Sequence, residues 1–139
     1  MMASIQKSLR IPKEVLKEIE QIAEERQKDF SSVANELLEE AVKTHRCPGI
    51  IFTEGVKGRR ARVAGTGIEV WEVIAAYQSV GESLQRLRQA YHWLTEQQIQ
   101  SVLGYYTAYP EEIDRLISAN ESWTPERVQK KYPFLPAGK

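Results

Sequence analysis

The order of apolar and polar residues divides the chain into three segments. Residues 4–12 (SIQKSLRIP) alternate imperfectly between apolar and polar positions and end at a proline, which predicts a short β-strand. Residues 13–46 change to helical spacing. Pro12 suits the start of a first helix, and Ser31 or Ser32 is expected to cap a second helix. The second helix has an apolar stripe too wide for a helix covered on one side only: Val33, Ala34, Leu37, Leu38, Ala41 and Val42.

Residues 47–69 have a different character, because glycines and a proline separate short β-favouring runs there. This spacing predicts a linker that leads into a β-hairpin or wing. From residue 70 onward the apolar residues return to helical spacing. Helices are expected over 70–80, 83–91 and 95–109, with Thr95 and Gln98 as a capping box. A helix restarts at Pro110, and Thr124 and Pro125 open a last short helix.

A single strand at residues 4–11 needs a partner edge, and no second suitable strand lies nearby in the sequence. The economical solution is a symmetric dimer in which two copies of the strand pair antiparallel and four helices share one core. The two-residue period then places Gln6, Ser8 and Arg10 on one face of the ribbon. Such a ribbon fits the major groove of DNA, where glutamine reads adenine and arginine reads guanine.

Residues 4–46 resemble a ribbon-helix-helix domain of the Arc, MetJ and CopG type. The resemblance implies that Gln6, Ser8 and Arg10 read bases. It also implies that the second helix holds a phosphate near Ser31 and Ser32 through its free amides. Lys7 lies on the face that is usually apolar in this family, and we expect it to extend to the DNA backbone. The alternative is a ribbon that dimerises the protein and binds nothing else.

Residues 50 to about 118 resemble the domain of unknown function 433, a helix-turn-helix-like family found among VapB-type antitoxins. The matching stretches are RRARVAGTGIEVWEVI, SVGESLQRLRQAYHWLT and QSVLGYYTAYPEEID. The resemblance implies a toxin partner, a PIN-type or PIN-like ribonuclease. Residues 95–109 contain no lysine or arginine. Although Gln97, Gln98, Gln100 and Ser101 are candidate base contacts, this composition favours internal packing or a protein partner over DNA.

The stretch KGRRAR is the most basic part of the chain and contains Lys57, Arg59, Arg60 and Arg62. Three interpretations stay open for it: a solvated loop, a wing on the phosphate backbone of DNA, or a clamp for an acidic partner.

The composition excludes several classes of protein. The 19 basic and 19 acidic residues cancel, so only local clusters indicate an anionic partner. The single cysteine, Cys47, excludes an internal disulfide framework, and the two histidines, His45 and His92, have no neighbours at metal-ligand spacing. We find no catalytic constellation, no cofactor motif, no secretion signal and no membrane span. We therefore expect a cytoplasmic protein that is not an enzyme and binds neither metal nor cofactor.

Together these patterns predict a mainly α-helical chain. Residues 1–46 form a ribbon-helix-helix domain (one strand and two helices in an intertwined dimer), 47–69 a linker and β-hairpin, and 70–139 a small helix-turn-helix-like domain. The predicted function is an antitoxin-type transcriptional regulator. It binds a palindromic DNA operator as a homodimer and neutralises a toxin through its carboxy-terminal domain. The alternative is a dimeric protein–protein adaptor that does not bind DNA.

Overall fold

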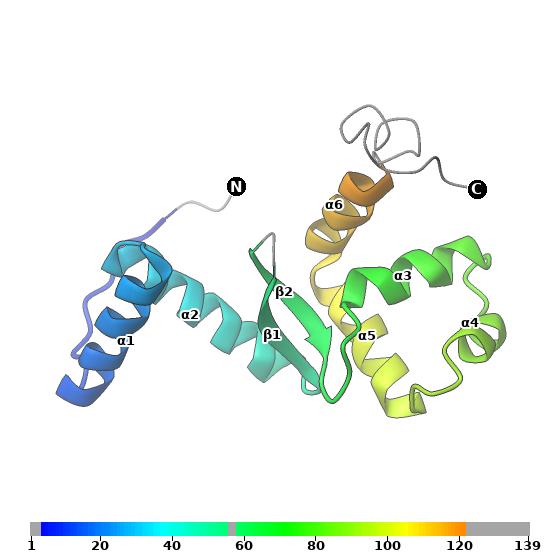
Figure 1. Ribbon diagram of the computed structural model, residues 1–139, viewed down its shortest axis with the longest axis horizontal. Helices are drawn as coiled ribbons and strands as arrows, with labels where there is room; N and C mark the ends of the chain where they lie inside the picture. The colour runs from blue at the N-terminus through cyan, green and yellow to red at the C-terminus, as the bar shows by residue number, and fades with distance from the viewer. Residues whose placement is uncertain (1–3, 56–57, 122–139) are drawn as a thin grey trace, which may run out of the picture. The chain divides into compact units, whose positions relative to one another are not determined.

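The computed structural model describes residues 4–55 and 58–121 of the chain. The chain divides into two compact units, Met1–Lys43 and Thr44–Lys139, called here the amino-terminal and carboxy-terminal units. The described residues form six helices and one two-stranded hairpin, which confirms the prediction of a mainly α-helical chain (Figure 1). The helix expected after Thr124 lies outside these residues, as does Lys57.

The amino-terminal unit holds α1 (Lys13–Arg26) and the greater part of α2 (Phe30–Arg46). Helix α1 begins after Pro12, whose carbonyl accepts the first helical hydrogen bond from the Leu16 amide at 2.9 Å. It ends at Gln27, which adopts a left-handed conformation (φ 55°) that lets the Lys28 amide donate to Ala23 O. The predicted positions of both helices are therefore confirmed.

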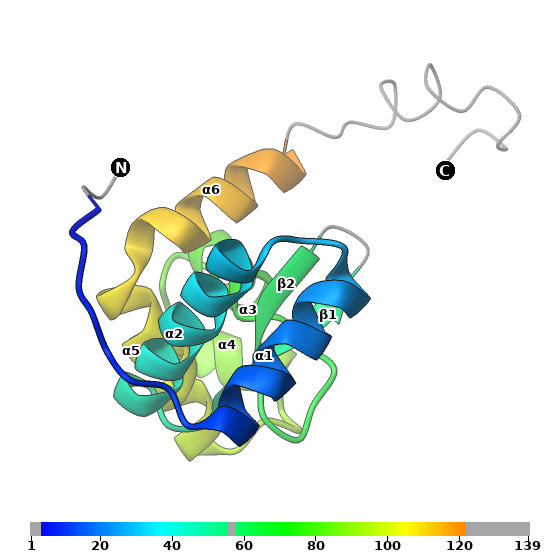
Figure 2. The same cartoon turned by 90° about the vertical axis from the view of Figure 1, so that its left-hand side faces the viewer.

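The predicted strand at residues 4–11 is absent from the single chain. Figure 2 shows these residues as an extended segment that leads into α1 without a strand partner. The absence of this strand has the same physical cause that led us to expect a dimer. An isolated extended segment has no neighbouring edge to receive its backbone hydrogen bonds, so it does not qualify as a strand by itself.

The predicted cap of α2 is also wrong. The helix begins one residue before Ser31, and the capping group is the Asp29 carboxylate, which accepts a hydrogen bond from the Ser32 amide at 2.7 Å. The Asp29 carbonyl accepts the first helical bond from the Val33 amide at 3.2 Å. Aspartate is as good a cap as serine, and its charge also favours the positive end of the helix dipole.

The hairpin opens the carboxy-terminal unit. Strand β1 (Ile50–Gly55) pairs antiparallel with β2 (Gly58–Val63), and the register runs from Ile50 opposite Val63 to Gly55 opposite Gly58. Because opposite residues share a face, Ile50, Phe52, Ala61 and Val63 point into the unit. A further bridge pairs Arg62 with Glu69, so the segment before α3 continues the sheet beyond β2.

Four helices complete the carboxy-terminal unit. They are α3 (Val70–Ser79), α4 (Leu84–Ala90), α5 (Glu96–Ala108) and α6 (Pro110–Glu121). Helix α3 contacts the other three helices and also β2, so it is the central element of the unit. The capping box of Thr95 and Gln98 is confirmed, with Gln98 N–H donating to Thr95 Oγ1 at 3.0 Å and Thr95 N–H to Gln98 Oε1 at 2.9 Å.

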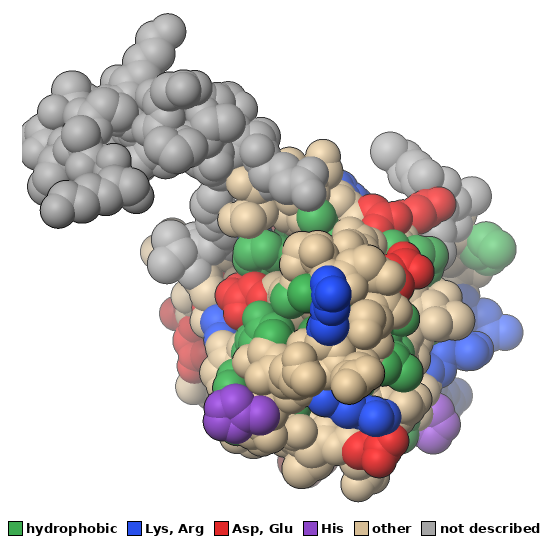
Figure 3. All heavy atoms as spheres, turned by 90° about the vertical axis from the view of Figure 1, so that its right-hand side faces the viewer, with side chains coloured by type: hydrophobic (Ala, Val, Ile, Leu, Met, Phe, Trp, Pro, Cys, Tyr) green, Lys and Arg blue, Asp and Glu red, His purple; other side chains and the backbone are tan. Residues whose placement is uncertain are grey.

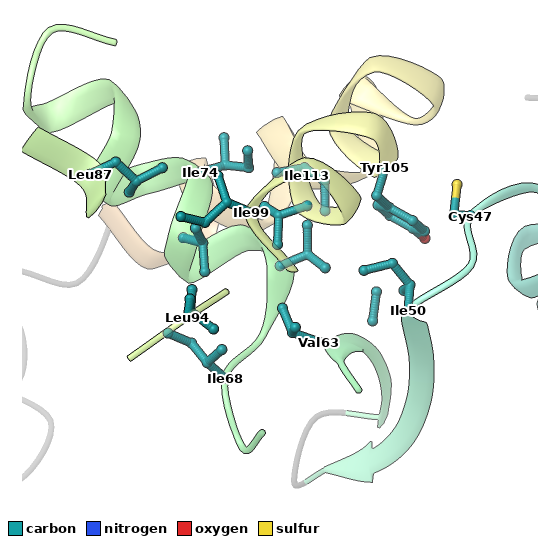
Figure 4. Packing of buried hydrophobic residues seen from close by; sticks show 14 of the residues in the cluster. Cys47, Ile50, Val63, Ile68, Ile74, Leu87, Leu94, Ile99, Tyr105 and Ile113 are labelled. Atoms are coloured by element: carbon teal, nitrogen blue, oxygen red, sulfur yellow. The ribbon is translucent and has the colours of Figure 1, made fainter. Parts of the chain in front are cut away.

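One apolar core joins the hairpin to these helices (Figure 4). Each element contributes buried side chains to it, and the largest that are fully buried are Tyr105, Ile50, Ile74, Leu87, Ile99 and Ile113. Full burial of an aliphatic side chain stabilises a fold by about 1.5–3 kcal/mol, so this unit has the means to fold by itself. Within the described residues, no helix is long and apolar enough to cross a lipid bilayer.

Gly49, in the turn before β1, provides a test of how α5 is anchored to the hairpin. Its φ of +93° is strained for any other residue, and an added Cβ would lie 2.7 Å from Ser101 Oγ. Gly49→Ala should therefore lower the free energy of unfolding by roughly 1–3 kcal/mol, from the backbone strain alone. The measurement is chemical denaturation of the full chain, monitored by tryptophan fluorescence.

Gly67→Ala is the matched control, because a Cβ there meets no atom within 4 Å. It should leave the unfolding midpoint nearly unchanged. Adding Ser101→Ala to Gly49→Ala removes the closest contact, with Ser101 Oγ, but leaves Ser101 Cβ 3.3 Å from the added Cβ and leaves the backbone strain. It also removes the hydrogen bond from Ser101 to Pro48 O, so the double variant should stay less stable than the natural chain. Equal stability of the Gly49→Ala and Gly67→Ala proteins would contradict the described turn.

Glu36 makes the connection between α1 and α2 sensitive to pH. Its carboxylate accepts hydrogen bonds from Lys28 and, at 2.9 Å, from Arg26. The Lys28 hydrogen bond is the main reason that the pKa of Glu36 lies below its ordinary value of 4.5. A carboxyl group whose folded-state pKa is lowered stabilises the fold above its unfolded-state pKa and loses this effect as the pH falls through the folded-state value.

We therefore expect the amide signals of α1 and α2 in an NMR titration to broaden or shift as the pH falls below about 4.5. Glu36→Gln should remove most of this dependence and leave both helices formed at neutral pH. Glu20→Gln changes an exposed glutamate of α1 and serves as the control. If the Glu36→Gln and Glu20→Gln proteins show the same pH dependence, the Glu36 carboxylate does not stabilise the connection between α1 and α2.

Candidate functional site

The three predicted base-reading residues lie on the extended segment before α1. Gln6, Ser8 and Arg10 are all exposed, and so is Lys7. Ile5 and Leu9, at the alternate positions of the same segment, are 88% and 68% exposed. Residues 4–11 therefore present both their polar and their apolar side chains to the surroundings of the single chain.

The apolar face of the amino-terminal unit is the most prominent feature of this unit. Among the described residues, seven large hydrophobic side chains are exposed, and five of these lie here: Ile5, Leu9, Val15, Leu38 and Val42. By contrast, only Ala23 and Val33 are buried among the described residues of this unit. A folded unit that exposes more large apolar side chains than it buries has a surface suited to another apolar surface.

Ser31 and Ser32, the predicted phosphate-binding residues, lie exposed in the first turn of α2. The Ser32 amide already donates to Asp29 Oδ1, and this hydrogen bond is the main reason that the pKa of Asp29 is lowered. A carboxylate therefore occupies the place where the free amides were expected to bind an anion. A phosphate at this helix end must displace the Asp29 side chain or bind beside a negative charge.

The arginines of KGRRAR are not in a solvated loop, because they belong to strand β2. Arg59 donates to Phe52 O at 3.0 Å and lies 3.4 Å from Glu54 Oε2. Arg60 Nη1 is 3.9 Å from Glu69 Oε1, and Arg62 donates to Gly67 O. All three guanidinium groups therefore hold the hairpin together, and none is a freely solvated cation of the kind that a phosphate-contacting wing needs.

Helices α4 and α5 occupy the positions predicted for a helix pair, and the side chains proposed to read bases divide into two groups. Gln98 is used by the capping box, and its Nε2 donates to Ala64 O at 3.4 Å. The Ser101 hydroxyl lies within hydrogen-bond distance of Pro48 O, at 3.1 Å. Gln97 and Gln100 are exposed. The first half of α5 therefore packs on the turn before β1 and is only partly available to a ligand.

The side of the carboxy-terminal unit shown in Figure 3 carries acidic and basic side chains scattered among uncharged ones. The charged side chains that this view displays do not gather into a basic stripe. Duplex DNA binding draws most of its non-specific affinity from clustered lysines and arginines. The side of the unit in this view therefore lacks the clustered cations that a duplex-binding surface uses.

The described residues contain no group of three or more histidine, cysteine, aspartate or glutamate side chains that could hold a metal ion. Cys47 is buried, and burial raises the pKa of its thiol, which lowers the thiolate fraction at neutral pH. Burial and the 2.7 Å hydrogen bond from Tyr105 to Glu112 likewise raise the pKa of Tyr105. Both side chains belong to the buried core of the carboxy-terminal unit.

Two structural features were not anticipated from the sequence. Asp29 stands three residues before Ser32, a spacing typical of a helix cap, and this signal was present in the chain. The bridge between Arg62 and Glu69 had no comparable signal, because it depends on how the turn after β2 folds back. Through this bridge Glu69 comes to lie beside the arginines of β2.

A comparison with protein families gives one match, and comparisons with curated proteins and with solved structures give none. Residues 50–106 match the family described as a protein of unknown function, DUF433. No match supports the resemblance of residues 4–46 to ribbon-helix-helix domains. The chain thus carries a DUF433 domain, which begins with β1 and ends within α5.

Proposed function

We propose that this protein is a homodimeric DNA-binding regulator of the antitoxin type. In this proposal two amino-terminal units associate through their apolar faces and bind a palindromic operator. The carboxy-terminal unit then binds a protein partner.

The observation that carries the proposal is the deficit of buried apolar surface in the amino-terminal unit. Leu38 and Val42 of α2 are 57% and 53% exposed, and Ile5 and Leu9 are exposed still more. Burying apolar surface contributes roughly 25 cal/mol per Å², so covering these side chains supplies the free energy for association. A second copy of the unit carries a surface of the same kind, and a two-fold axis brings the two together.

Pairing with a second copy also provides the strand partner that residues 4–11 lack. Two copies aligned antiparallel complete each other's backbone hydrogen bonds and place the apolar positions 5, 9 and 11 toward the helices. Gln6, Ser8 and Arg10 then line the outer face in both copies. Residues 4–13 contain Lys7, Arg10 and Lys13 and no acidic residue, so this segment is positively charged, which favours an anionic ligand.

The proposed partner of the carboxy-terminal unit follows from its resemblance to VapB-type antitoxins. By that resemblance the partner is a PIN-type or PIN-like ribonuclease. The internal hydrogen bonds of Gln98 and Ser101 support a protein-binding role for this unit over base reading by α5.

A second candidate function is a dimeric adaptor that does not bind DNA. The observation that favours it is the Asp29 carboxylate at the start of α2, where the regulator needs to hold a phosphate. Binding to duplex DNA separates the two candidates, because only the regulator binds a duplex with an affinity that falls as salt rises.

Leu9→Asp tests the dimer. In a monomer this residue is exposed, so the substitution should be harmless. In the proposed dimer it places a charge in the shared core, at a cost of at least about 1–3 kcal/mol in each copy. We expect analytical ultracentrifugation to show a dimer for the natural chain and a monomer for Leu9→Asp at the same concentration.

Ser8→Asp is the matched control for this test, since it introduces the same charge at the neighbouring position of the opposite face. This variant should remain a dimer. If Leu9→Asp is dimeric to the same degree as Ser8→Asp, residues 4–11 do not form the proposed interface.

Arg10→Ala tests operator recognition. The loss of a base contact should weaken binding to the operator by about 1–3 kcal/mol per contact, felt twice per dimer, while binding to scrambled duplexes falls much less. The measurement is a titration at fixed salt, with the region upstream of the reading frame as the source of the operator. The fold is expected to persist because Arg10 is exposed.

Lys17→Ala, which removes an exposed cation from α1, is the control for a general effect of charge. Equal losses on operator and scrambled duplexes would assign Arg10 to the phosphate backbone. No loss on either duplex would favour the adaptor.

A further inference from the structure

The hairpin has an outer face that its contacts within the chain do not complete. Opposite positions in the register place Ile51 beside Arg62 and Thr53 beside Arg60, on the side away from the core. The bridge from Arg62 to Glu69 extends this row across a third segment of chain. We call Ile51, Thr53, Arg60, Arg62 and Glu69 the outer hairpin face.

The polar groups of the outer hairpin face are only partly satisfied. Within the described residues, Thr53 Oγ1, Arg62 Nε and Glu69 Oε1 are buried and have no hydrogen-bond partner. Glu69 Oε1 lies 3.9 Å from Arg60 Nη1, which is an ion pair but too long for a hydrogen bond. The face therefore carries two guanidinium groups and one carboxylate, and one donor (Arg62 Nε), one acceptor (Glu69 Oε1) and the Thr53 hydroxyl lack a partner. Buried polar groups of this kind are rare in folded proteins and require an explanation.

The geometry of Arg62 indicates which ligand would complete the face. Its Nη1 donates to Gly67 O and its Nε is buried, and among the described residues no carboxylate pairs with its guanidinium group. The positive charge of Arg62 is therefore left for a carboxylate of another molecule, which binds a guanidinium group through charge-assisted hydrogen bonds. Ile51, directly opposite Arg62, is 41% exposed and offers an apolar contact beside the charged one.

We infer that the outer hairpin face is a docking surface for an acidic segment of a protein partner. A carboxylate of the partner pairs with the guanidinium group of Arg62. An apolar side chain of the partner covers Ile51. This inference rests on the part of the proposed function that assigns protein binding to the carboxy-terminal unit, and it is independent of operator binding.

Charge and polarity favour a protein over a nucleic acid as the occupant. Two of the hairpin arginines already have acidic neighbours, with Arg59 near Glu54 and Arg60 near Glu69. Phosphate contacts draw their affinity from cations that release counterions, so cations with acidic neighbours contribute little. An arginine beside an exposed aliphatic side chain, by contrast, is a common composition for the centre of a protein interface.

The test is an NMR titration of the ¹⁵N-labelled full chain. The probes are a short synthetic peptide that alternates glutamate and leucine, the same peptide with glutamine in place of every glutamate, and a short random-sequence duplex. We expect the glutamate peptide to shift the amide signals of β1, β2 and Glu69, together with the side-chain Nε signal of Arg62. The glutamine peptide should shift them much less.

Arg62→Gln should weaken binding of the glutamate peptide roughly tenfold or more, because a charge-assisted hydrogen bond is lost. Arg115→Gln removes an exposed arginine from α6 and should leave peptide binding unchanged. The amide spectrum of each variant verifies its fold. If Arg62→Gln does not fold, Ile51→Gln changes an exposed side chain of the same face and should also weaken binding.

The inference is overturned if the glutamate peptide leaves these signals in place, if the glutamine peptide binds equally well, or if the duplex shifts them more strongly. Dimerisation and operator binding are measured on the same samples and depend on the amino-terminal unit. Peptide binding without operator binding would reject the regulator and keep the docking surface. Operator binding without peptide binding would keep the regulator and reject the docking surface.

Discussion

The constraint on which the proposed biology of this chain depends is that its amino-terminal unit cannot bury its own apolar residues. Two helices and a short extended segment present Leu9, Leu38 and Val42 to the surroundings and cover little more than Ala23 and Val33. Helices of this length gain most of their stability from packing of the apolar face. Contact with another apolar surface would therefore stabilise this unit. The extended segment likewise finds no strand partner within the single chain.

The carboxy-terminal unit, by contrast, buries its apolar residues in a core of its own. Its hairpin and helices enclose a core in which Ile50, Ile74 and Ile99 are fully buried, and α3 contacts every other helix of the unit. Polar contacts then fasten the hairpin to this core, through Gln98 on Ala64 and Ser101 on Pro48. A unit that is complete in its core is free to use its surface for binding, and the outer hairpin face is where its polar groups remain incomplete.

The two units thus differ in what they need from a partner. In the proposed dimer, a second copy of the same chain covers the apolar side chains of the amino-terminal unit by symmetry. In the inferred docking surface, an acidic segment of a different protein supplies a counter-charge for Arg62. A chain that dimerises at one end and binds a second protein at the other is compatible with both the regulator and the adaptor. The difference between them lies in what the face of Gln6, Ser8 and Arg10 contacts.

The sequence by itself determined the helices, the hairpin and the capping box of α5, but not the cap of α2. Periodicity located α1 to α6, glycines marked the hairpin, and the spacing of Thr95 and Gln98 identified a capping box, because each signal acts over a few residues. It did not determine the partners of Arg59, Arg60 and Arg62. In the sequence these arginines form a basic run, and a solvated loop was one interpretation of it. Only the tertiary structure decided that they lie on a strand and pair with Phe52, Glu69 and Gly67, because cross-strand register and the turn after β2 bring these groups together. For residues 4–11, the alternation of apolar and polar positions predicted a strand, and the structure decided that the single chain forms none, because no neighbouring edge receives its backbone hydrogen bonds.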